Sequence, residues 1–200
     1  NNSRVQTGYT AFRLEVDDEY IQPIVSKDGS YNKEAYRDFQ NNVEPYGIDI
    51  ITEIDTPAHS GAFANIEDGK LMMDFNHLDL RTTEKYDAAI SVVKKILDEY
   101  LGESINDPNR VIQEDVFHIG TDEYPTSYLT QYKNYTADLI EHVTSKGYKV
   151  RLWGSFGSFD NPNGKAIDPT NATINQWSQS WAKAKVCMDY GFDIINTLYN

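Results

Sequence analysis

Three stretches of the chain combine helical spacing of apolar residues with a following glycine and a short run of β-branched or aromatic residues. The helical stretches are residues 32–46, 127–146 and 182–190, and the runs after them are residues 48–51, 148–152 and 192–195. A glycine after a helix adopts the left-handed conformation without steric cost, which makes it a typical helix end. Helix followed by strand, repeated along the chain, predicts an α/β fold.

The clearest single helix is predicted over residues 83–101, where the apolar positions form one face about 100° wide. Two further strand-like runs lie at residues 116–119, which end at Gly120, and at residues 172–175. The pattern therefore predicts strands near residues 48, 116, 149, 173 and 192, mostly separated by helices. Strands joined in this way pair in parallel, either in a doubly wound sheet or in part of a (β/α)8 barrel.

Side chains suited to chemistry follow the predicted strands, at the carboxyl ends where both folds place their active sites. They are Glu53, Asp55 and His59 after the first strand, Asp122 and Glu123 after the second, Trp153 after the third and Trp177 after the fourth. Two adjacent carboxylates repel each other, and tryptophan walls remove water from them. The pKa of one of the pair is therefore expected to rise until that group holds a proton near neutrality. Such a group can act as a general acid.

Composition narrows the class of partner. A net charge of −13 repels phosphates and anionic lipids, so we expect no nucleic acid and no membrane insertion. The sole cysteine, Cys187, leaves no intramolecular disulfide and no cysteine-based metal site. Fourteen tyrosines and three tryptophans offer aromatic faces on which sugar rings stack. We expect a neutral ligand, with no cofactor and no metal.

Two motifs carry a resemblance to a known family. Phe117-His118-Ile119-Gly120-Thr121-Asp122-Glu123-Tyr124 resembles the His-x-Gly-Gly/Thr-Asp-Glu signature of family 20 glycoside hydrolases. Ile51-Thr52-Glu53-Ile54-Asp55-Thr56-Pro57-Ala58-His59 resembles that family's Pro-Glu-Ile-Asp-x-Pro-Gly/Ala-His segment. The resemblance implies a (β/α)8 TIM barrel, present here as a partial barrel of about strands three to seven within a single domain over residues 1–200. We then expect that activity needs the missing strands.

The resemblance also implies an activity and roles for the residues. It implies release of terminal β-linked N-acetylhexosamine, either N-acetylglucosamine or N-acetylgalactosamine, from a glycan by a retaining mechanism in which the sugar's own 2-acetamido oxygen attacks the anomeric carbon. Glu123 would be the general acid and base, and Asp122 would orient the acetamido group and stabilise its growing charge. His59 would hydrogen-bond near Glu123, and Trp153 and Trp177 would wall the acetamido pocket.

Other interpretations stay open at this point. Asp55 could bind substrate or support neighbouring loops. We expect structural roles for Glu53 and His118. Tyr199 is a further candidate for binding the acetamido group. The protein could instead be a lacto-N-biosidase that releases a disaccharide, a carbohydrate-binding protein without turnover, or a metal-dependent hydrolase, although the spacing matches no zinc motif. We expect an extracellular or cell-surface location in a bacterium.

Overall fold

The computed structural model describes residues 10–198. The chain divides into two compact units. One comprises Asn1–Ile51 with His59–Asp115, and the other comprises Thr52–Ala58 with Val116–Asn200. We call them the helical unit and the sheet unit. No helix among the described residues is long and apolar enough to cross a membrane.

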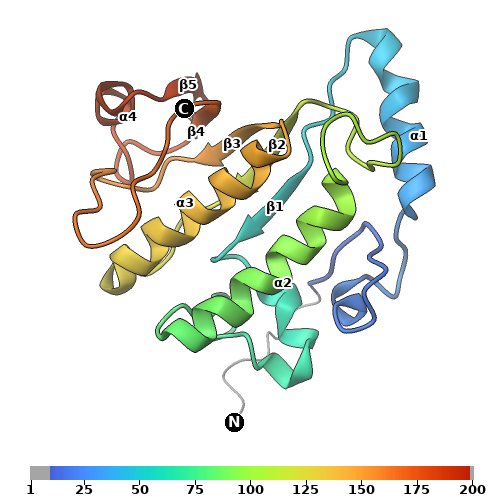
Figure 1. Cartoon of the computed structure of the whole chain (residues 1–200), viewed down its shortest axis with the longest axis horizontal. Coiled ribbons are helices and arrows are strands. Elements are labelled where there is room, and N and C mark those ends of the chain that lie inside the picture. The colour runs from blue at the N-terminus through green and yellow to red at the C-terminus, as the bar shows by residue number, and fades with distance from the viewer. Residues whose placement is uncertain (1–9, 199–200) are drawn as a thin grey trace. The chain divides into compact units, whose positions relative to one another are not determined.

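The sheet unit contains a five-stranded sheet whose strands pair in parallel and in chain order (Figure 1). The strands are β1 (Glu53–Thr56), β2 (Val116–Gly120), β3 (Lys149–Trp153), β4 (Ala172–Gln176) and β5 (Asp193–Asn196). Helix α3 (Leu129–Ser145) joins β2 to β3, and helix α4 (Ala184–Tyr190) joins β4 to β5. This arrangement confirms the predicted α/β fold with parallel strands.

The two faces of the sheet differ in polarity because side chains alternate along a strand. One face carries the buried apolar side chains of β2, β3 and β4, and α3 packs on β2 and β3 while α4 packs on β5 (Figure 1). Register places Glu53 beside His118 and His118 beside Arg151, so polar side chains of three strands share the opposite face. The chemistry of the unit is therefore concentrated on one side and at one end of the sheet.

The helical unit contains α1 (Lys33–Val43) and α2 (Thr83–Leu101) with short 3-10 turns at Gln22–Ile24, Glu44–Tyr46, Gly61–Asn65 and Glu67–Gly69. Asn32 caps α1 by accepting a hydrogen bond from the backbone N–H of Ala35 at 2.7 Å, which satisfies one of the free donors at a helix start. The predicted apolar face of α2 is buried from Ala89 to Leu101. The bounds of α2 match those predicted from its spacing.

The prediction of a first strand at residues 48–51 is wrong, because β1 begins at Glu53. The run 48–51 has β-branched residues but no buried face, and Ile48 is 49% exposed. In β1, by contrast, Ile54 and Thr56 are buried. The carbonyl of Thr52, directly before β1, accepts a hydrogen bond from the backbone N–H of His118 at 2.9 Å. Pairing with β2 and burial of side chains, rather than local β-propensity, therefore determine where the first strand lies.

The connection from β3 to β4, residues 154–171, contains no helix, so the strict strand–helix alternation is interrupted there. Side chains of α3 hold this connection. Lys133 Nζ donates to the carbonyl of Asp160 at 2.6 Å, and the backbone N–H of Lys165 donates to Asn134 Oδ1 at 2.8 Å. The loop that leaves the end of β3 is thus fixed to the helix that precedes that strand.

Candidate active site

The turn after β2, residues 120–123, holds Asp122 and Glu123 in a rare backbone conformation; we call it the acidic turn. Gly120, Thr121 and Glu123 have φ values of 67°, 64° and 51°. A left-handed backbone costs a residue other than glycine roughly 1–3 kcal/mol, and such residues gather at functional sites. Two of them flank Asp122, so other contacts must hold the acidic turn in place.

Asp55 of β1 explains why the acidic turn begins with glycine. The register between β1 and β2 shifts between Glu53 and Thr56, and a bulge of this kind re-aims the side chains within it. A Cβ atom added at Gly120 would overlap the Oδ1 and Cα atoms of Asp55 and lie 2.8 Å from its Cγ. Only glycine leaves room for Asp55, which therefore lies directly against the acidic turn.

Trp153, the last residue of β3, is fixed by residues of the two preceding strands. Its indole Nε1 donates a hydrogen bond to Glu53 Oε1 at 2.7 Å. The imidazole of His118 contacts the indole with a distance of 4.7 Å between ring centroids. The aromatic face of Trp153 is thereby held in one orientation, which lowers the entropy cost of packing a ligand on it.

His118 is buried and uncharged near neutral pH. Burial, followed by the nearby positive charge of Arg151, lowers the pKa of His118 to about 3. Its Nδ1 accepts a hydrogen bond from the backbone N–H of Gly120 at 3.1 Å, so the proton of the neutral ring is assigned to Nε2. Nδ1 also lies 3.4 Å from Glu53 Oε1, but an uncharged ring forms no ion pair there. His118 supports the strand end, the structural role favoured from the sequence.

The two acids of the turn differ in exposure: Asp122 is buried and Glu123 is half-buried. Burial first, then the negative charge of Asp122 and more weakly that of Asp55, raise the pKa of Tyr132 on α3 well above its ordinary value. Asp55 and Asp122 therefore lie near one phenol group. Because Glu123 is the more exposed of the two, its carboxyl group is better placed than that of Asp122 to exchange protons with a ligand or water.

Trp177 follows β4 directly. Its ring lies 6.3 Å from that of Trp181, and its buried Nε1 has no hydrogen-bond partner among residues 10–198. Asn175, two positions earlier, is the register partner of Trp153, so the chain brings both tryptophans to the same end of the sheet.

The structure thus brings five predicted site residues together at the carboxyl ends of β1 to β4. These are Asp55, Asp122, Glu123, Trp153 and Trp177. Glu53 and Asp55 lie within the first strand, so the prediction that they follow it is wrong. His59 belongs to the helical unit, where it is exposed with a φ of 53°, and its hydrogen bond near Glu123 stays a prediction. Tyr199 lies outside the described residues.

Two sequence comparisons relate the chain to known proteins. The profile of the glycosyl hydrolase family 20 catalytic domain matches residues 8–137. Lacto-N-biosidase of Bifidobacterium bifidum is 22% identical over 202 aligned residues, which cover 83% of this chain and 16% of that protein.

Solved structures show the same fold. The pneumococcal exo-β-D-N-acetylglucosaminidase StrH matches with a TM-score of 0.72 at 15% identity, over 94% of this chain and 54% of that one. The family 20 β-N-acetylhexosaminidase of Streptomyces coelicolor A3(2) matches with a TM-score of 0.68 at 17% identity, over 94% and 40%. The chain therefore has part of a TIM-barrel fold. It spans about half the length of the StrH chain and a smaller share of the lacto-N-biosidase and of the Streptomyces enzyme. Because the family profile covers well over half of its residues, the chain belongs to glycosyl hydrolase family 20.

Proposed function

We propose that the protein carrying this chain is a glycoside hydrolase that releases terminal β-linked N-acetylhexosamine from oligosaccharides or glycans. The observation that supports this most directly is the strained acidic turn, which carries Asp122 and Glu123, begins against Asp55 and lies at the same end of the sheet as the fixed indole of Trp153. Glycosidases use a pair of carboxyl groups, one of them as general acid, to cleave the bond to a sugar's anomeric carbon.

The proposed mechanism uses the substrate's acetamido group as nucleophile. Glu123 donates its proton to the glycosidic oxygen as the bond from that oxygen to the anomeric carbon breaks. The acetamido carbonyl oxygen bonds to the anomeric carbon and forms a cyclic oxazolinium ion, while buried Asp122 accepts a hydrogen bond from the acetamido N–H and stabilises the positive charge. Water then attacks the anomeric carbon as the bond from that carbon to the acetamido oxygen breaks, and the Glu123 carboxylate takes the water proton, which restores the acid and the acetamido group.

Release of a disaccharide is the second candidate, favoured by the similarity to a lacto-N-biosidase. The same acid pair serves both reactions, and they differ in the sugar bound beyond the N-acetylhexosamine. Rates on an aryl N-acetylglucosaminide and on an aryl lacto-N-bioside decide between them: the preferred substrate identifies the unit released. An extracellular or cell-surface location in a bacterium stays a prediction.

Glu123→Gln tests the proposal in the protein at its natural length. The amide cannot donate or accept the catalytic proton, so kcat on an aryl N-acetylglucosaminide should fall by about 10³-fold. Glu141→Gln, on an exposed position of α3 in the same unit, is the matched control and should keep wild-type activity. Wild-type kcat in Glu123→Gln would contradict the assigned role. Loss of turnover after complete metal removal by a chelator would favour the metal-dependent alternative.

A further inference from the structure

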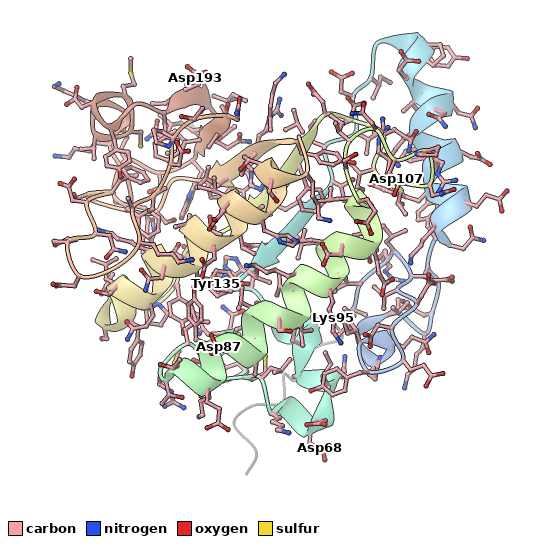
Figure 2. All side chains as sticks on the ribbon, viewed as in Figure 1. Asp68, Asp87, Lys95, Asp107, Tyr135 and Asp193 are labelled. Atoms are coloured by element: carbon pink, nitrogen blue, oxygen red, sulfur yellow. The ribbon has the colours of Figure 1, made fainter. Side chains whose placement is uncertain are left out.

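Two tyrosines of α3 reach back to the acidic turn that precedes the helix. Tyr132 and Tyr135 are three positions apart and so share one face of the helix, and both are fully buried (Tyr135 is labelled in Figure 2). Their only polar atom is the hydroxyl, which needs a hydrogen-bond partner when it is removed from water. The partners show what the two residues do.

Both hydroxyl groups end on Thr121, which precedes Asp122, or on the residue hydrogen-bonded to Thr121. Tyr132 donates to the carbonyl oxygen of Thr121 at 2.7 Å. Tyr135 donates to Thr56 Oγ1 at 2.8 Å, and the carbonyl oxygen of Thr56 accepts from the backbone N–H of Thr121 at 3.0 Å. The N–H and the C=O of Thr121 are therefore both fixed, one by the end of β1 and one by α3.

This arrangement acts on the residue directly before Asp122. Thr121 has a φ of 64°, a conformation that persists only where surrounding contacts over-determine it. Its peptide groups set the direction of the Asp122 side chain and, one residue later, that of Glu123. Loss of the Tyr132 hydroxyl would remove the donor to the Thr121 carbonyl, and loss of the Tyr135 hydroxyl would remove the donor to Thr56 Oγ1. Either loss would allow the turn to relax toward an ordinary backbone conformation.

We propose that Tyr132 and Tyr135 are positioning residues whose hydroxyl groups hold Asp122 and Glu123 in their working orientation. The inference rests on the proposed function of that acid pair. The sequence holds a weak signal for it, two tyrosines at helical spacing shortly after the acidic motif, but many such pairs only fill cores.

The hydroxyls are expected to act at every working pH. Burial first, and then the hydrogen bond and nearby charges, leave the pKa of Tyr135 above its ordinary value, as burial does for Tyr132. Both groups stay protonated and remain donors. A defect caused by losing them should therefore be the same at pH 5 and pH 8, whereas loss of a proton-transfer group would change the pH profile.

Tyr132→Phe and Tyr135→Phe test the inference, with Tyr100→Phe as the matched control. Tyr100 is buried in the helical unit and donates to the carbonyl of Leu14 at 3.0 Å, so the control removes the same kind of hydrogen bond elsewhere. We expect kcat to fall about ten-fold in each test variant with KM changed less than about two-fold, because misplaced groups lose rate rather than affinity. The control should keep its kcat, and the loss should be independent of pH.

Amide hydrogen exchange of residues 116–124 gives a readout that does not need turnover. Both test variants should exchange several-fold faster there than the wild type and Tyr100→Phe. Wild-type kcat together with wild-type exchange in both test variants would overturn the inference while leaving the proposed function intact. A wild-type protein that hydrolyses no N-acetylhexosaminide would overturn the proposed function, and unchanged exchange would then still overturn the positioning of the turn.

Discussion

At the scale of single residues, the site depends on a few positions where the backbone and a neighbour allow one residue type. Gly120 lies against the backbone of Asp55, and Glu53 fixes the indole of Trp153. The sequence could point to Asp122 and Glu123 because the motif around them is specific. The sequence could not indicate the hydrogen bond between Glu53 and Trp153. These residues are 100 positions apart, and only the pairing of the strands brings them together.

Gly120→Ala should destabilise the sheet unit far more than a left-handed backbone alone explains. The added Cβ meets Asp55 Cα as well as its carboxyl group, and backbone cannot yield cheaply. Gly47→Ala is the control, because Gly47 has a φ of 72° but nothing within 4 Å of the added Cβ. Chemical unfolding should show a loss of about 1 kcal/mol for Gly47→Ala and at least about 3 kcal/mol for Gly120→Ala. Equal losses would contradict the steric account.

Glu53→Leu should loosen Trp153 and raise KM for an aryl N-acetylhexosaminide about five-fold, because the indole N–H loses its charged acceptor. Glu53→Gln keeps an acceptor oxygen and should raise KM less than about two-fold. Steady-state kinetics on both variants measures the difference. An unchanged KM in Glu53→Leu would mean that the orientation of Trp153 does not matter for binding.

At the scale of elements, apolar spacing predicted the helices well, because α2 follows one continuous periodic face. The start of β1 was missed for a physical reason: the β-branched run at 48–51 is more strand-like than Glu53–Thr56, yet only the latter pairs with β2. The loop from β3 to β4 likewise has no local signal, since side chains of α3 fix it. Contacts between residues far apart in the chain determine the position of β1 and the path of this loop, and a single sequence does not reveal those contacts.

Asp79 tests what holds the start of α2. Its buried carboxylate accepts hydrogen bonds from Arg81 Nε and Nη2, both at 2.8 Å, and from Lys85. Burial works to raise the pKa of Asp79, but the bonds from Arg81 and Lys85 outweigh it and lower the pKa to about 2. The stabilisation is therefore present above the unfolded value of 3.8 and is lost as the pH falls toward 2.

Asp79→Asn should accordingly cost about 3 kcal/mol of unfolding free energy at pH 7, and less below about pH 3. Asp87→Asn, at an exposed position of α2 (labelled in Figure 2), should change the free energy by less than about 0.5 kcal/mol. Urea titration at the two pH values measures both. An Asp79→Asn variant as stable as Asp87→Asn would refute the ion pairs as the support of α2.

At the scale of the whole molecule, the chain is acidic overall, and its sheet carries polar side chains on one face. Family membership follows from motifs that the sequence already contained, whereas the arrangement of Asp55, the acidic turn and Trp153 required the sheet. The chain spans 54% of the StrH chain it matches. The activity is therefore proposed for the protein at its natural length.

His118 should limit stability in acid. Its folded pKa of about 3 lies below the unfolded value of 6.5, so only the unfolded chain takes up a proton between these values. Stability is thus full above pH 6.5 and falls by up to about 1.4 kcal/mol per pH unit below it. His118→Asn keeps an acceptor for the Gly120 N–H but does not titrate. Unfolding free energies should show about 1.7 kcal/mol less acid loss for the variant between pH 6.5 and pH 5; parallel curves would contradict the buried neutral histidine.

The central claim is that the substrate supplies its own nucleophile while Asp122 and Glu123 assist. The most direct measurement compares kcat/KM of the natural-length protein on an aryl β-N-acetylglucosaminide and on the matching aryl β-glucoside, in which a hydroxyl replaces the acetamido group. The account predicts that the glucoside is hydrolysed at least about 10³-fold more slowly, because the attacking carbonyl is gone. Comparable rates on the two substrates would contradict it.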